Sequence, residues 1–300
     1  YDIYVVNQSA WGWNVPESHI TGESYVTIDN DYLGSNFDSD YCFNSIDKMK
    51  VSVAHEFFHA IQRSYWPNYH TDHDFLLEMS SMWFEDLIVP DCNDYLGWID
   101  DLSYTIFRNP TQQFDGSDLE PNQSSAKFGY SMALFGHYLS NKIESSIMRA
   151  IWERYSISID GTSLNAAGVA IKSVVEENYD ISFGQTWTDF ISSNMLSGEF
   201  DFFNEDIYYH SDQQLIDPII VEPSNYLWIN SADNINMELD YSSVDISSSL
   251  STSNMYLDVE ILNIDNISGY YVVKDPSSSR GVIENNILSD ILINSGGIFS

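Results

Sequence analysis

Positively charged residues are scarce in this chain. Its 300 residues include 11 Lys and Arg against 45 Asp and Glu, so the formal net charge is −34. A nucleic-acid-binding protein needs a basic surface that displaces counterions from phosphates, and anionic membranes also attract basic segments. The composition therefore argues against nucleic-acid binding and against adsorption to an anionic membrane.

Long apolar runs are also absent. No stretch approaches the roughly 18 apolar residues that cross a bilayer, so we expect no membrane insertion. The chain begins at Tyr1 without a basic, apolar leader, as expected of a processed secreted protein. A surface dense in carboxylates suits an extracellular and even a saline setting, because salt screens their repulsion. The alternative is an ordinary acidic secreted protein.

Cysteine is limited to Cys42 and Cys92. Two cysteines are too few for a disulfide scaffold, but they can form one bridge in an oxidising compartment; the sequence leaves the pairing open. Apolar residues still make up 43% of the chain and aromatic residues 15%, which is enough to build a core. We therefore expect a folded, soluble protein.

The hydrophobic pattern predicts an α+β fold. Alternating runs at the N-terminus indicate strands, and a three- and four-residue period over Ile46, Met49, Val53, Phe57 and Ile61 indicates a helix of about twenty residues from Ser45. The expected strands are Tyr1–Asn7 and Ser24–Ile28, and the further expected helices are 74–89, Ser125–Lys142, Ser145–Tyr155, Ser163–Asn178 and Phe183–Leu196.

The composition changes after about Leu215. Ser, Asn and Asp become dense, and short alternating runs suggest a β-sandwich-like module, at Asn225–Ile229, Ile235–Leu239, Tyr256–Ile264 and Gly269–Val273. We therefore expect a catalytic domain over residues 1–214 and a small β-rich C-terminal module over residues 215–300.

The first long helix contains His55-Glu56-Phe57-Phe58-His59, the HExxH pattern. Four residues make slightly more than one helical turn, so both imidazoles project from one face and can bind one metal ion, with Glu56 beside them. This pattern favours zinc.

Glu78 follows His59 after 18 residues, inside the apolar segment of the next expected helix. Two adjacent helices can bring its carboxylate to the metal, which would complete a His₂Glu site with one position open to water. The alternative is a solvated helical carboxylate, but the apolar neighbours of Glu78 favour the ligand, because a charge in such surroundings needs a partner.

These motifs resemble the gluzincin metallopeptidases, the clan of thermolysin and aminopeptidase N. VAHEFFHAIQ followed by FLLEMSSMWFEDLIVPDCNDY is similar, more closely, to a group of secreted bacterial metalloproteases, as are GWNVPE, YVTIDND and YSMALFGHYL. The resemblance covers roughly residues 1–200 and departs at Leu76, Met79 and Ser80, none of which is a ligand position. It implies a zincin-like catalytic domain, zinc bound by His55, His59 and Glu78, and Glu56 as general base.

The chemistry of these residues agrees with that implication. Zinc lowers the pKa of a water ligand towards about 7, and Glu56 can take its proton during attack on a peptide carbonyl and protonate the departing amine. For the oxyanion donor we choose Tyr130 over Tyr104, His137 and Tyr138, because Tyr130 opens a predicted helix. A packed tyrosine is the alternative.

Other polar residues are candidates for supporting roles. Glu85 or Asp86 is a candidate acceptor for the second N–H of a ligand imidazole, and Ser81 lies one turn after Glu78. Four aspartates crowd the loop around Gly34, which makes Ca²⁺ a candidate second ion, with an ordinary acidic loop as the alternative. They are Asp29, Asp31, Asp38 and Asp40.

Taken together, these residues predict a secreted zinc endopeptidase acting on proteins or peptides. We expect the strand Ser24–Ile28 to bind substrate backbone beside the active-site helix. Aminopeptidase action is less favoured, since no motif before His55 would grip a free amine. Two other classes stay open: a non-catalytic zinc-containing binding protein, and a zinc hydrolase of another amide, ester or glycan, with Trp11, Trp13 and Trp66 available to stack on sugars.

Overall fold

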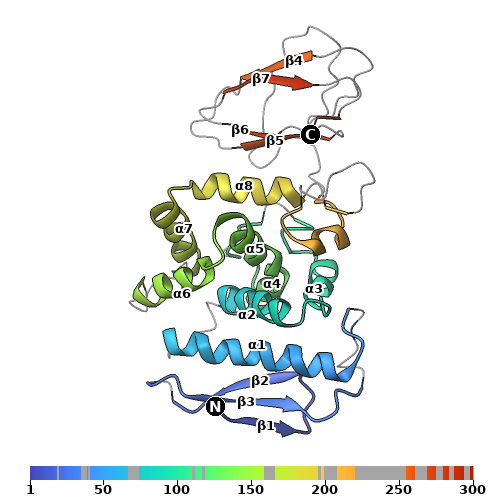
Figure 1. The fold of residues 1–300 in the computed structure, drawn as a ribbon, viewed down its shortest axis with the longest axis vertical. Helices are drawn as coiled ribbons and strands as arrows, with labels where there is room; N and C mark the ends of the chain where they lie inside the picture. The colour runs from blue at the N-terminus through green and yellow to red at the C-terminus, as the bar shows by residue number, and fades with distance from the viewer. Residues whose placement is uncertain are drawn as a thin grey trace. The chain divides into compact units, whose positions relative to one another are not determined.

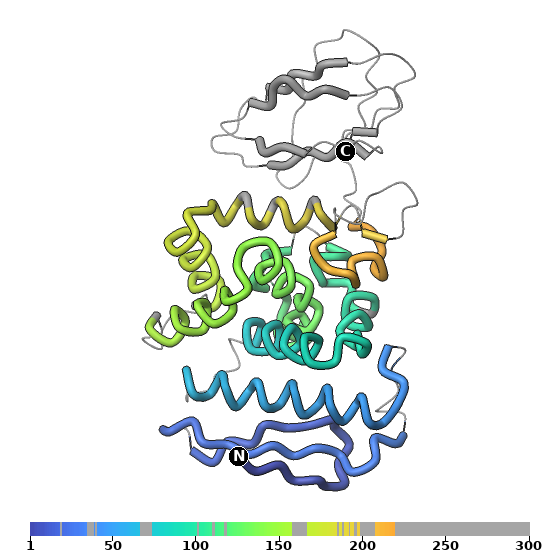
Figure 2. The backbone as a smooth tube through the Cα atoms, viewed as in Figure 1, coloured from blue at the N-terminus to red at the C-terminus, as the bar shows by residue number. Residues whose placement is uncertain are grey.

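The computed structural model describes residues 1–18, 20–34, 39, 41–66, 74–109, 112–116, 119–158, 166–194, 197–198 and 208–219 (Figure 2). It also describes the backbone of strands β4–β8 (Figure 1). The chain forms two compact units, Tyr1–Asp180 and Ile181–Ser300. Helices and strands occur in both, so the mixed α+β class is confirmed. The compositional change at residue 215 does not coincide with this division, and a module boundary there stays a prediction.

A small sheet opens the first unit (Figure 1). Its strands are β1 (Ile3–Val6), β2 (Gly12–Pro16) and β3 (Ser24–Asp29), in the order β1-β3-β2. β3 pairs in parallel with β1 and antiparallel with β2, so its backbone is engaged on both sides. The prediction that Ser24–Ile28 binds substrate is therefore wrong, because a central strand has no free hydrogen-bonding edge. Of the two edge strands in the described sheet, β2 is the one that packs against α1.

Helix α1 (Ser45–Tyr65) confirms the predicted helix of about twenty residues from Ser45. It begins where the Asn44 side chain accepts a hydrogen bond from the Asp47 backbone N–H, and it ends at Trp66, whose backbone is extended. The apolar period located the helix but not its buried face, since Ile46 is 62% exposed and Phe57 is 40% exposed. The buried face is partly polar; it comprises Lys48, Val51, Ser52, Ala54, Phe58, Gln62 and Arg63.

Helix α2 (Asp74–Ile88) packs against α1 and is buried around most of its circumference, its carboxylates Glu78, Glu85 and Asp86 included. The predicted helix Ser125–Lys142 is instead three segments: α4 (Ser125–Ser131), α5 (Ala133–Tyr138) and the π-helical turn η3 (Leu139–Ile143). The break at Met132 lets two short helices each pack on α2.

A glycine allows α4 to lie close against α2. A Cβ built on Gly129 of α4 would lie 2.7 Å from the Phe75 carbonyl oxygen and 2.9 Å from Glu78 Cβ. Any other residue there would push α4 away from α2, and with it the neighbouring Tyr130.

The rest of the first unit consists of α3 (Tyr95–Asp101), which the sequence did not predict, α6 (Ile147–Ser158) and α7 (Ala166–Tyr179). A disulfide joins Cys42, just before α1, to Cys92, between α2 and α3. It packs with Val51 and Val89 in a small apolar cluster. The segment before α1 and the segment after α2 are thus covalently tied.

The second unit contains α8 (Phe183–Asn194), the 3₁₀ turn η5 (Ser211–Leu215) and two small sheets. β4 (Met255–Glu260) pairs with β7 (Ile287–Ile293), and β5 (Gly269–Lys274) lies between β6 (Arg280–Ile283) and β8 (Ile298–Phe299). The predicted strands Asn225–Ile229 and Ile235–Leu239 lie outside the described residues. None of the described helices is long and apolar enough to span a bilayer.

Candidate metal centre

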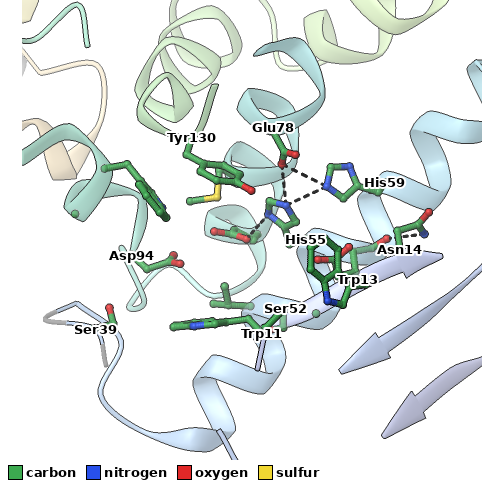
Figure 3. Close-up of a pocket in the computed structure, with 18 of the residues that line it drawn as sticks. Trp11, Trp13, Asn14, Ser39, Ser52, His55, His59, Glu78, Asp94 and Tyr130 are labelled. Atoms are coloured by element: carbon green, nitrogen blue, oxygen red, sulfur yellow. Dashed lines mark hydrogen bonds and ion pairs between the residues drawn. The ribbon is translucent and has the colours of Figure 1, made fainter. Parts of the chain in front are cut away.

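His55 and His59 on α1 converge with Glu78 on α2 (Figure 3). The Nε2 atoms of the two imidazoles lie 3.1 Å apart, and Glu78 Oε2 lies 3.1 Å from His55 Nε2 and 3.4 Å from His59 Nε2. The three side chains lie close enough together to hold one metal ion. The predicted ligand set is therefore brought together in space.

Each imidazole is held from behind through its other nitrogen. His55 Nδ1 lies 2.8 Å from Glu85 Oε2, a carboxylate that is 2% exposed, and His59 Nδ1 lies 2.7 Å from Gln62 Oε1. Since these partner oxygens accept hydrogen bonds, both Nδ1 atoms carry hydrogen and both Nε2 atoms can present a lone pair to a cation.

The electrostatics of the cluster favour a positive charge at its centre. Burial alone would raise the pKa of Glu78, but the imidazoles of His59 and His55 outweigh it and lower that pKa from 4.5 to about 2. Burial alone would lower the pKa of His55, yet the carboxylates of Glu85 and Glu78 raise it well above 6.5. The carboxylates thus stabilise positive charge where the three ligand atoms meet, and a metal ion would supply such a charge.

Behind His55 lies a second buried carboxyl group. Burial raises the pKa of Glu85, and burial together with the charge of Glu85 raises the pKa of Asp94 well above its ordinary value. Glu85 and Asp94 thus form a buried pair of carboxyl groups behind His55. The sequence did not predict a role for Asp94, because this residue lies at the start of α3 and meets Glu85 of α2 only once the chain has folded.

The ligands lie in a cleft of about 810 Å³. Its lining includes six consecutive residues, Ser9–Asn14, which contain most of the edge strand β2, and the aromatic residues Tyr41, Trp98 and Tyr130. Tyr130 lies with its ring 6.0 Å from that of His55 and 5.1 Å from that of Trp98, and its hydroxyl points toward the ligands (Figure 3). Tyr104, His137 and Tyr138, the other candidates for the oxyanion donor, are not among the described residues that line the cleft.

Glu56 faces the cleft beside strand β2. A Cβ built on Gly12 would lie 2.6 Å from Glu56 Cγ, so only glycine leaves room for this side chain. Asn14, two residues along β2, donates to the Glu56 carbonyl oxygen at 3.2 Å and accepts from the Arg63 guanidinium. The edge strand is thus anchored on the turn of α1 that carries Glu56.

The other predicted residues take different places. Asp86 pairs with His137 at 3.0 Å in the core, so Glu85 and not Asp86 supports a ligand imidazole. In the acidic loop, Asp29 accepts backbone N–H groups from Gln8 and Tyr32. Asp38 and Asp40 lie outside the described residues, and a calcium site there stays a prediction.

Comparisons with protein-family models, with curated proteins and with solved structures find no match to this chain.

Proposed function

We propose that this protein is a secreted zinc-dependent endopeptidase in which His55, His59 and Glu78 bind the ion and Glu56 is the general base. The observation that carries the proposal is the spacing of the three ligand atoms, 3.1, 3.1 and 3.4 Å. Ligand atoms about 2.0–2.2 Å from zinc at tetrahedral angles lie roughly 3.3–3.6 Å from one another, close to these distances. If two nitrogens and one carboxylate oxygen occupy three corners of a tetrahedron around zinc, the fourth corner is left for water or substrate.

The donor set also fits zinc chemically. With hydrogen on both Nδ1 atoms, the three atoms that face each other across about 3 Å are all electron-rich and need a shared cation between them, which a zinc ion would be. A bound zinc ion supplies a Lewis acid that polarises a peptide carbonyl and lowers the pKa of water.

Glu56 supplies the proton transfers. Its position one residue after His55, on the cleft side of α1, suits a base that takes the proton of the attacking water and delivers it to the amine leaving group. Gly12 keeps its side chain space free. A structural metal site has no need of a general base beside an open coordination position, which favours turnover over a purely binding role.

Substrate positioning falls to strand β2 and Tyr130. The backbone of an edge strand can pair with an extended peptide, and β2 lines the cleft along Gly12, Trp13 and Asn14. Tyr130 can donate its phenol hydrogen to the carbonyl oxygen as negative charge develops there.

The cleft continues on both sides of the ligands, toward Asn14 in one direction and toward Asp94 in the other (Figure 3). A cleft lined on both sides of the ligands has room for substrate residues on either side of the scissile bond, which favours endopeptidase over aminopeptidase action. The Cys42–Cys92 disulfide supports an oxidising, extracellular setting. The zincin fold and gluzincin membership are part of the same proposal.

The test is zinc analysis combined with casein hydrolysis for the wild type and for Glu56→Gln. We expect one zinc per chain in both proteins, hydrolysis by the wild type that a chelator abolishes, and a loss of at least about 100-fold in Glu56→Gln. Glu153→Gln, an exposed carboxylate on α6, is the matched control and should retain full activity. Zinc-dependent hydrolysis that survives Glu56→Gln would refute the mechanism, and absence of zinc from the wild type would refute the site.

A further inference from the structure

Gln62 is a buried polar residue that the proposed reaction does not use directly. It lies one helical turn after His59 on α1, is 1% exposed, and all of its side-chain hydrogen bonds run either to His59 or to helix α2. A buried amide with this many partners restricts the groups around it, because each partner constrains its orientation.

The neighbours on α2 determine which way the amide points. Gln62 Nε2 lies 2.8 Å from the carbonyl oxygen of Leu77, an atom that can only accept. It also lies 3.0 Å from Ser80 Oγ, whose own hydrogen is donated to the Leu76 carbonyl at 2.6 Å, so that Ser80 too can only accept from Gln62. The nitrogen must therefore face α2.

That orientation decides the state of the metal ligand. With its nitrogen toward α2, Gln62 presents Oε1 to His59 Nδ1 at 2.7 Å, and an amide oxygen only accepts. His59 must then carry its hydrogen on Nδ1, which leaves Nε2 free to bind a metal ion. The Ser81 oxygen lies beside both donors, 3.2 Å from the same Nδ1 and 3.0 Å from Gln62 Nε2, where it can share their hydrogens as an acceptor.

We propose that Gln62 is the positioning residue of the metal site: one amide sets the tautomer and ring orientation of His59 and fixes α1 on the part of α2 that carries Glu78. This inference rests on the proposed zinc site. His55 has a separate support in Glu85, so the two imidazoles are held independently, one by a carboxylate and one by an amide tied to the partner helix.

The experiment measures zinc affinity by chelator competition in four variants of the full chain. Gln62→Met removes both roles of the amide, and we expect the dissociation constant for zinc to rise 10- to 100-fold. Gln62→Glu keeps an acceptor oxygen for His59 but loses the donor to α2; its zinc affinity should return to within about threefold of the wild type, while its metal-free form melts at a lower temperature. Gln62→Asn, one methylene shorter, should bind zinc as weakly as the methionine variant.

Gln213→Met is the matched control. Gln213 is 0% exposed and likewise bonds to the backbone, through the Ser193 carbonyl and the Tyr209 N–H, but it belongs to the second unit. Its substitution should lower stability and leave zinc affinity within about threefold. Cobalt substitution gives a spectroscopic readout, since the visible spectrum of the ion reports its ligand geometry. We expect this spectrum to change in Gln62→Met and to stay as in the wild type in Gln213→Met.

Several outcomes would overturn the inference. These are zinc binding within threefold of the wild type in both Gln62→Met and Gln62→Asn, a glutamate variant no better than methionine, or an equal loss of affinity in Gln213→Met. If Gln62→Met does not fold, the contrast between the glutamate and asparagine variants decides. Wild-type protein that binds no zinc would refute the proposed function itself, which is a separate result from these.

Discussion

Replacing Gly12 by alanine would test whether strand β2 and the general base are fitted to each other. The new methyl group would lie 2.6 Å from Glu56 Cγ and 3.2 Å from its Oε1. Carbon atoms in contact need about 3.5 Å, so one side must yield by about 1 Å. Strand β2 is held by its pairing with β3 and by Asn14 on α1, so the Glu56 side chain is the part that moves.

A misplacement of about 1 Å at a catalytic group costs on the order of 100-fold in rate, or about 2.7 kcal/mol of transition-state stabilisation. We therefore expect kcat/KM for a peptide substrate to fall about 100-fold in Gly12→Ala with one zinc per chain retained, because Glu56 is not a ligand. The assay is steady-state hydrolysis of a fluorogenic peptide, with metal analysis on the same sample.

Gly97→Ala is the control in the same cleft. A Cβ at Gly97 would meet the ring of Tyr41 at 3.7 and 3.8 Å, which is ordinary contact, so its activity should stay within about twofold of the wild type. Wild-type activity in Gly12→Ala would refute the argument that Glu56 works from the observed position. Loss of zinc in that variant would show that β2 shapes the ligands and not the base.

Three further predictions concern the surroundings of the site. Glu85→Gln removes a buried charge whose pKa is raised by burial, so we expect a 10- to 100-fold weaker zinc affinity through His55 without a lower melting temperature of the metal-free protein; a fall in melting temperature at unchanged affinity would contradict this. Reduction of the Cys42–Cys92 disulfide, which spans 50 residues, should lower the free energy of unfolding by about 4 kcal/mol in urea titrations, and no change on reduction would rule out a stabilising role. Burial raises the pKa of Asp29, but backbone N–H donors outweigh it and the net shift is downward; its stabilisation is therefore present above about pH 4 and lost as the pH falls through the lowered pKa. Asp29→Asn should lower the melting temperature by roughly 2–4 °C at pH 7, and a difference that does not shrink in acid would refute the assignment.

Local sequence accounts for much of the site. An α-helix repeats every 3.6 residues, so the spacing of His55 and His59 places both imidazoles on one face wherever the helix packs. The apolar surroundings of Glu78 marked it as a charge that needs a partner, and the structure supplies the two imidazoles. These are properties of single helices and can be predicted without knowing their neighbours.

The tertiary structure decided what the helices meet. The period of apolar residues located α1, but its buried face carries Lys48 and Gln62 while Phe57 is exposed, because contacts with α2 and the sheet outweigh side-chain polarity. Glu85 and Asp86 are adjacent in the sequence and about 100° apart around α2, and only the packing of α1 and α5 on that helix assigned one to His55 and the other to the core.

The amino-acid sequence by itself determined the strongly negative net charge, the spacing of the two histidines along α1 and the helix that carries Glu78, since these depend on composition and on the period of one helix. Only the tertiary structure decided that β2 is the edge strand along the cleft, that Gly12 makes room for Glu56, and that Gln62 orients His59. Those are contacts between residues up to 44 positions apart, here Gly12 and Glu56, and they exist only once separate elements have packed.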